Sequence, residues 1–115
     1  MERVNANELE YRKGRSGPKY LFRGPRIDWG LIRFLPGERL GKHLHERVEE
    51  TFYFISGAGL IEVNGVQYDI GPGDAFRIDP DETHDIVNTG DEALDGVFIK
   101  HCYPVSYTHL RAHET

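Results

Sequence analysis

The 115-residue sequence lacks most of the features that mark disulfide-rich, membrane-spanning and nucleic-acid-binding proteins. Its single cysteine, Cys102, cannot build a disulfide framework within the chain. No apolar run approaches the roughly 20 residues of a membrane-spanning helix, and no basic-then-apolar leader opens the chain. The 14 basic residues are outnumbered by 19 acidic ones, and they form no basic stripe for nucleic acid. We therefore expect a cytoplasmic protein that binds neither membranes nor nucleic acid.

A sustained helical period is also absent, and only residues 5–11 favour a turn of helix. Glycine and proline instead separate short apolar stretches at intervals of roughly 8–12 residues, a spacing typical of all-β sandwiches and barrels. We interpret Cys102 as a buried residue that behaves as a small hydrophobe. The expected strands are residues 19–22, 27–34, 42–45, 51–55, 59–63, 66–70, 75–78, 84–88 and 94–101.

The last segment, residues 105–115, is similar to a translated sequencing adapter of the transposon-end type. We interpret it as an artefactual tail, in which His109 and His113 have no functional role. On this interpretation the natural chain was cut near Pro104. Residues 1–104 then have the length of one domain with a single core.

The clearest local prediction is a β-hairpin around Asn64-Gly65. Asn-Gly between apolar runs favours a two-residue type I′ turn, in which both central residues need φ > 0. This turn pairs Val63 with Val66 and Ile61 with Tyr68, which puts these four apolar residues on one face. We expect that face to point inward.

Four potential metal ligands occur at informative spacings: His43, His45, Glu50 and His84. In a strand, His43 and His45 would point the same way, and Glu50 and His84 would join them from two further strands. Three imidazoles and a carboxylate suit one divalent ion of Fe, Mn, Ni, Cu, Co or Zn, with coordination positions left open. The alternative is that each buried histidine is satisfied by a hydrogen bond.

These residues resemble the two sequence motifs of the cupin superfamily. The first motif, G-x5-H-x-H-x3,4-E-x6-G, is filled completely by Gly37, His43, His45, Glu50 and Gly57. The glycines of such a motif stand at strand boundaries, where a tight turn or φ > 0 is expected.

The second cupin motif, G-x5-P-x-G-x2-H-x3-N, is matched at Gly73, His84 and Asn88. Asp79 stands where the family usually has Pro, and Asp81 stands where it usually has Gly. These departures concern the geometry of a turn more than the ligands. The gap between the two motifs is similar to that of compact bacterial cupins.

The resemblance implies an all-β fold, a cupin-type antiparallel β-barrel or jelly roll in a single domain. It implies that one divalent transition metal is bound by His43, His45, Glu50 and His84. It also implies a homodimer, formed by pairing or exchanging N-terminal strands such as residues 19–22. Tyr53, on the face opposite Glu50, is a candidate for contact between subunits.

A cavity beside the ligands is expected to be mostly apolar, because alternation brings Phe52 and Phe54 to the same face as Glu50. Arg33 and Arg77 are candidates to receive a carboxylate at its mouth. The alternative is that the apolar residues form the core, as we favour for Phe52 and Ile78, and that both arginines are solvated surface charges. The substrate-pocket candidates are Phe54, Phe76, Ile86, Arg33 and Arg77.

Two functions are compatible with these residues. The first is a metalloenzyme that acts on a small organic substrate, with dioxygenase-, decarboxylase- or isomerase-like chemistry. No separate general base is evident for it. The second is a non-catalytic, metal-dependent binding or sensor module.

Overall fold

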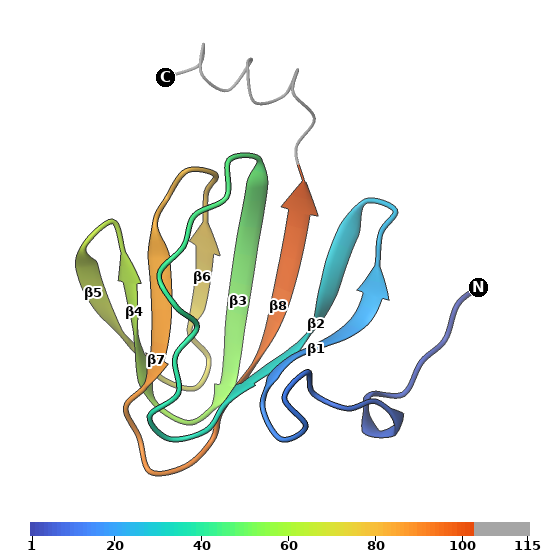
Figure 1. The fold of residues 1–115 in the computed structure, drawn as a ribbon, viewed down its shortest axis with the longest axis horizontal. Helices are drawn as coiled ribbons and strands as arrows, with labels where there is room; N and C mark the ends of the chain where they lie inside the picture. Colours follow the sequence, from blue (N-terminus) through green and yellow to red (C-terminus); the bar gives the residue numbers. More distant parts are fainter. Residues whose placement is uncertain (103–115) are drawn as a thin grey trace.

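The computed structural model describes residues 1–102, which form one short 3-10 helix, η1 (Ala6–Glu8), and eight β-strands (Figure 1). The expected tail at 105–115 and the expected domain end at Pro104 lie outside these residues. The strands are β1 (Gly17–Arg23), β2 (Ile27–Phe34), β3 (Val48–Ser56), β4 (Gly59–Val63), β5 (Val66–Ile70), β6 (Ala75–Ile78), β7 (His84–Asn88) and β8 (Leu94–Cys102).

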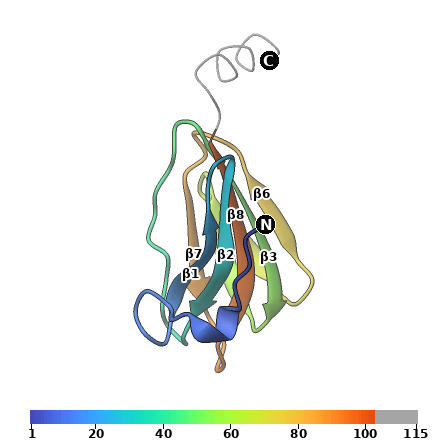
Figure 2. The same ribbon diagram turned by 90° about the vertical axis from the view of Figure 1, so that its right-hand side faces the viewer.

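The strands form two antiparallel sheets with the crossed connections of a jelly roll, which confirms the predicted fold class. The larger sheet has the order β1-β2-β8-β3-β6, and the smaller has the order β5-β4-β7 (Figure 1). The N-terminal segment crosses the outer face of the larger sheet (Figure 2), where Lys19 donates a hydrogen bond to the Ala6 carbonyl. Among residues 1–102, no helix is long and apolar enough to cross a membrane.

The core is made by side chains that alternate inward along the strands of both sheets. Phe52 and Phe54 of β3 and Ile86 of β7 are at most 1% exposed, as strand alternation predicts. The other buried apolar residues of the cluster are Ile32, Phe34, Ile61, Ile70, Ile78, Leu94 and Phe98.

The predicted strand at residues 42–45 is wrong. The connection between β2 and β3 runs along the free edge of β7 (Figure 1) and pairs with it only in places, at Arg39 with Val87 and at His43 with His84. Gly41, at φ 97°, interrupts the extended backbone, so a continuous ladder cannot form. The segment is an irregular fourth member of the smaller sheet.

The predicted hairpin is confirmed in its turn and its register. Asn64 and Gly65 have φ values of 49° and 83°, and Val63 pairs with Val66 and Ile61 with Tyr68. The inward orientation holds for Ile61, which is fully buried, but Val66 and Tyr68 are exposed. The reason is that β5 is the outer strand of the smaller sheet, so nothing among the described residues covers that end of the face.

Two further predictions have opposite outcomes. The motif glycines Gly37, Gly57 and Gly73 all have positive φ, as expected at strand boundaries. At Gly57 a Cβ would also lie 2.5 Å from the Ala93 carbonyl oxygen, so this position has no room for a side chain. Cys102, in contrast, is exposed and free at the end of β8, and its predicted burial is wrong.

Candidate metal centre

Glu50 and His84 meet inside the barrel because β3 and β7 belong to different sheets that face each other. Both side chains point inward, and Glu50 is 4% exposed and His84 2% exposed. His84 Nε2 lies 3.2 Å from Glu50 Oε1. A carboxylate and an imidazole are therefore held in contact away from solvent.

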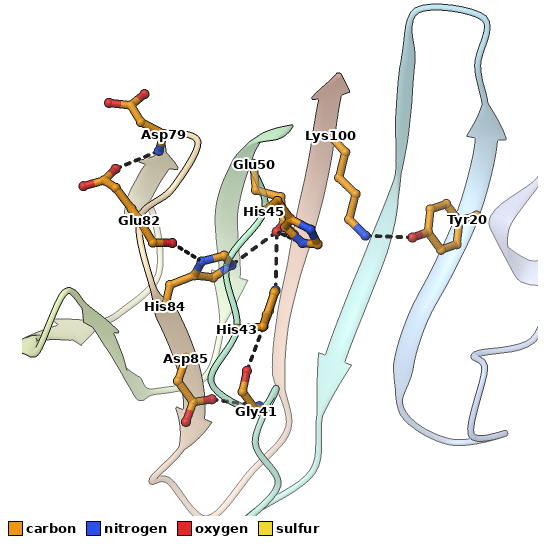
Figure 3. A network of polar contacts seen from close by, with 10 residues as sticks. All are labelled: Tyr20, Gly41, His43, His45, Glu50, Asp79, Glu82, His84, Asp85 and Lys100. Atoms are coloured by element: carbon orange, nitrogen blue, oxygen red, sulfur yellow. Dashed lines mark hydrogen bonds and ion pairs between the residues drawn. The ribbon is translucent and has the colours of Figure 1, made fainter. Parts of the chain in front are cut away.

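His43 and His45 reach the same carboxylate from the irregular segment (Figure 3). Their Nε2 atoms lie 3.7 Å and 3.3 Å from Glu50 Oε1. The donor atoms of His43, Glu50 and His84 all lie within 4.8 Å of one another, whereas His45 falls outside that group. The structure thus brings the three predicted histidines to one oxygen of the fourth predicted ligand, Glu50. Three of the four residues, His43, Glu50 and His84, form a tight cluster.

The ring nitrogens on the far side of the cluster fix the tautomers of two histidines. His43 Nδ1 lies 2.8 Å from the Gly41 carbonyl oxygen, and His84 Nδ1 lies 3.2 Å from the Glu82 carbonyl oxygen. Because a carbonyl oxygen only accepts, each Nδ1 carries the proton, and in the neutral ring Nε2 presents a lone pair. Lone pairs that converge with a carboxylate form a donor set that fits a divalent transition-metal ion.

The pKa shifts describe a site that attracts positive charge. Burial raises the pKa of the Glu50 carboxyl, but its hydrogen bond to His84 and the nearby cations outweigh burial, and the net shift is downward. Burial lowers the pKa of His84, but the hydrogen bonds to Glu50 and to the Glu82 carbonyl raise it overall. Burial also lowers the pKa of His45, against the attraction of Glu50. Glu50 is thus held as a carboxylate by the positive charge and the hydrogen bond around it.

A second, buried carboxylate positions the segment that carries His43. Asp85 Oδ2 accepts a hydrogen bond from Arg39 Nε at 2.9 Å, and Asp85 Oδ1 accepts one from the Gly41 backbone N–H at 2.9 Å. The Gly41 carbonyl in turn accepts from His43 Nδ1 (Figure 3). Sequence reasoning missed Asp85, because alternation only places it on the side of β7 opposite His84.

The turn before His84 forms despite its departures from the family pattern. Asp81 has φ 72°, a conformation that suits glycine and that aspartate tolerates better than most residues. The Asp79 N–H donates to the Glu82 carboxylate at 2.7 Å, and the Asp81 N–H donates to the His45 carbonyl at 2.7 Å. The turn is therefore also a contact for the segment that bears His45.

A cavity of about 210 Å³ opens beside the cluster, with Glu50 and His43 in its wall. Its lining combines apolar residues with seven charged ones, most of which the sequence did not predict. The charged lining residues are Arg12, Lys13, Arg33, Glu38, Arg39, Glu50 and Lys100, and the others are Gly17, Pro18, Tyr20, Ile32, Phe34, Leu40, His43 and Phe98.

Of the five pocket candidates, this cavity lining includes only Arg33. The Arg33 guanidinium is paired with Asp95, with Nε 2.6 Å from Oδ1. Phe54 and Ile86 are fully buried in the core, and Phe76 packs against that core. The Arg77 side chain is 69% exposed, and its Nε lies 3.9 Å from Glu49. The cations Lys100, Arg12 and Lys13 were missed, because their convergence depends on which strands and loops meet.

The fold and the site define a jelly-roll protein with a candidate metal site of histidine and glutamate between its two sheets. A family model described as "Cupin domain" matches residues 30–100. The chain therefore belongs to the cupin family.

Relatives with similar sequences come from two bacteria. The chain is 38% identical over 64 residues to an oxalate-binding protein of Thermotoga maritima, covering 56% of this chain and 53% of that protein. It is 36% identical over 69 residues to protein SchB of Streptomyces halstedii, covering 60% of this chain and 50% of that protein. The chain thus matches about half the length of each relative.

Solved structures with low sequence identity share the fold. KdgF from Halomonas sp. has a TM-score of 0.77 at 20% identity, covering 93% of this chain and 98% of that one. The polyketide cyclase RemF from Streptomyces resistomycificus has a TM-score of 0.76 at 20% identity, covering 90% and 80%. A predicted oxalate decarboxylase from Thermotoga maritima has a TM-score of 0.68 at 23% identity, covering 89% and 100%.

Proposed function

We propose that this cupin holds one divalent transition-metal ion with His43, His45, Glu50 and His84 and acts on a small organic molecule. The observation that carries the proposal is the arrangement of three Nε2 atoms within 3.7 Å of one buried carboxylate oxygen. A divalent ion is one partner that the three imidazole nitrogens and the carboxylate can share, in a donor set of the kind such ions prefer. An ion held there supplies Lewis acidity and open positions for O2, water or a carbonyl oxygen.

A catalytic role is favoured over simple binding because the cavity reaches the cluster itself, with Glu50 and His43 in its lining. The other lining carboxylate, Glu38, is engaged, since it accepts hydrogen bonds from the Leu35 N–H and the Ser16 hydroxyl. No lining carboxylate is then left as a separate general base. The proposed chemistry is dioxygenase-, decarboxylase- or isomerase-like, in which an ion supplies most of the activation.

Turnover by metal-loaded protein tests the catalytic role. Fe- and Mn-loaded protein is incubated with a panel of small organic acids while oxygen uptake and product formation are followed. We expect turnover that His84→Ala abolishes and that His101→Ala, a histidine outside the cluster, leaves unchanged. Absence of turnover across the panel, with the metal bound, would contradict an enzymatic function.

The second candidate is a non-catalytic, metal-dependent binding or sensor protein. It is favoured by the name of the relative from Thermotoga maritima, an oxalate-binding protein. Tight binding of a small acid without conversion would support this function. The same metal-loaded samples serve both tests, so the two functions are separated by product analysis.

We further propose that residues 1–104 are the natural domain, that the protein is cytoplasmic, and that it binds neither nucleic acid nor membranes. A homodimer is part of the proposal. It is supported by β1, which contains residues 19–22 and stands at one edge of the larger sheet. An uncovered edge strand favours association with a second copy.

A further inference from the structure

One cation of the cavity wall is placed beside the metal cluster by strand register. Lys100 of β8 is the direct Cα partner of Glu50 on β3. Directly opposed residues in neighbouring strands have side chains on the same face, so Lys100 shares the inner face with Glu50. Figure 3 shows its ammonium group extending from the cluster toward β1. Lys100 lines the same cavity as Glu50 and His43.

Among the cations of the cavity wall, Lys100 has a neutral hydrogen-bond partner. Its Nζ donates a hydrogen bond to the Tyr20 hydroxyl at 2.9 Å. Two arginines of the wall, Arg33 and Arg39, are instead paired with Asp95 and Asp85. Among residues 1–102, no carboxylate lies within ion-pair distance of Lys100, and the Glu50 oxygen nearest the cluster already contacts three imidazoles.

The position of the Tyr20 hydroxyl is fixed because the Tyr20 ring is packed between neighbouring side chains. The ring packs edge-on against Phe98 with 4.9 Å between centroids. The Arg23 guanidinium lies over the ring at 3.8 Å and that of Arg12 at 5.7 Å from its centroid. A ring fixed in this way directs its hydroxyl toward Lys100 at little cost in rotamer entropy.

The hydrogen bond between Lys100 and Tyr20 leaves each side chain able to donate further hydrogen bonds to a ligand. Because Tyr20 Oη accepts from Lys100, its own proton is free, and the ammonium group retains two more N–H donors. Two donors side by side match the two oxygens of a carboxylate, and a charge-assisted pair of this kind is stronger than a neutral one. Arg12 and Lys13 add positive charge to the same wall.

We propose that Lys100 and Tyr20 bind one carboxylate of a small dicarboxylate ligand whose other end faces the metal cluster. The inference rests on the proposed metal centre, since a cation there offsets the charge of Glu50 toward an incoming anion. Lys100 and Tyr20 would then select the charge of the ligand, and the cavity of about 210 Å³ has room for a small molecule.

Calorimetry with a matched pair of ligands tests this inference. Protein loaded with Mn is first assayed for metal content and then titrated with malonate and with malonamide, its neutral diamide. We expect wild-type protein to bind malonate at least tenfold more tightly than malonamide. Lys100→Met should lose about tenfold or more of the malonate affinity, and Tyr20→Phe a smaller part of it, because a hydrogen bond to a charged group is removed.

Lys42→Met is the control, because Lys42 pairs with Glu62 and does not line the cavity. It should bind malonate like the wild type, and all variants should keep their metal. The inference would be overturned if metal-loaded wild-type protein did not prefer malonate to malonamide, or if Lys100→Met bound malonate as tightly as the wild type. Neither result would affect the proposed metal centre. Protein that takes up no metal would overturn the proposed function and, with it, the inference. If Lys100→Met fails to fold, unchanged affinity in Tyr20→Phe and Lys100→Gln overturns the inference.

Discussion

At the scale of single residues, the histidines of the cluster are oriented by backbone contacts as well as by Glu50. His43 and His84 each direct Nε2 toward Glu50 because their Nδ1 atoms bind backbone carbonyls. Such contacts hold an imidazole ring in one orientation and one tautomer, which is what the proposed metal centre requires of its histidines. Asp85 positions His43 indirectly. Its carboxylate accepts a hydrogen bond from the Gly41 N–H, and the Gly41 carbonyl in turn accepts one from His43.

Replacing Asp85 should therefore weaken metal binding without removing a ligand. Asp85→Ala deletes the acceptor for the Gly41 N–H and releases the segment that carries His43. Loss of such an outer contact typically costs about 10–100-fold in metal affinity, and we expect a fall in that range. Competition with a chromogenic chelator measures it.

Asp85→Asn keeps an oxygen that can accept from Gly41, so it should restore much of the affinity lost in Asp85→Ala. Asp69→Ala, a change on the outer side of β5, serves as the surface control. A metal affinity of Asp85→Ala equal to that of the wild type would show that the support from this carboxylate is unimportant.

At the scale of elements, the sequence predicted those features that depend on neighbouring residues. The Asn64-Gly65 turn fixed the register of β4 with β5, and alternation placed Glu50, Phe52 and Phe54 on one inner face. The segment of His43 and His45 was assigned to a strand because i and i+2 histidines suit one. Both rings still reach Glu50, but from an irregular backbone that β7 holds at two positions.

The features that sequence reasoning missed depend on long-range pairing. Lys100 faces Glu50 only because β8 pairs with β3 in one register, and Tyr20 reaches Lys100 only through β1 and β2. Nothing in the local pattern around these residues specifies that register. The convergence of His43, His45, Glu50 and His84, in contrast, could be predicted because their spacing resembles a known motif.

The pairing of β1 with β2 depends on Gly30. A Cβ at this position would lie 2.0 Å from the Lys19 carbonyl oxygen, which belongs to the backbone and cannot turn away. We expect Gly30→Ala to destabilise the protein by about 1–3 kcal/mol, the usual cost of overpacking, and to displace Tyr20. Urea unfolding measures the change.

Gly71→Ala is the matched control for this prediction. Gly71 does not have positive φ, and the nearest atom to its Cβ would be an Asp74 oxygen at 3.8 Å, an ordinary contact. The free energy of unfolding of Gly71→Ala should stay within about 0.5 kcal/mol of the wild-type value. Equal stability of Gly30→Ala and Gly71→Ala would contradict the close approach of β1 and β2.

At the scale of the whole molecule, the outer face of the larger sheet carries exposed apolar side chains. Tyr53 of β3 is 48% exposed and Ile99 of β8 is 38% exposed. Apolar side chains gathered on one face favour contact with a second copy, in line with the proposed homodimer. We expect light scattering to give twice the mass of one chain.

A charge in this face should shift the dimer toward monomer. Tyr53→Glu would bury a carboxylate in the contact, whereas Tyr68→Glu would place one at an equally exposed position of the smaller sheet. We expect the first variant to dissociate at low micromolar concentration and the second to remain dimeric. A wild-type chain that is monomeric at all concentrations would remove the homodimer from the proposal.

The most direct test of the whole account is the metal content of the protein. It is measured by mass spectrometry after purification without chelators or an affinity-metal column, on a chain with His109 and His113 replaced by alanine so that the tail cannot contribute. The account predicts about one divalent transition-metal ion per chain, and loss of that ion in Glu50→Gln and His84→Ala. A wild-type chain that takes up no such ion, or variants that retain it fully, would contradict the account.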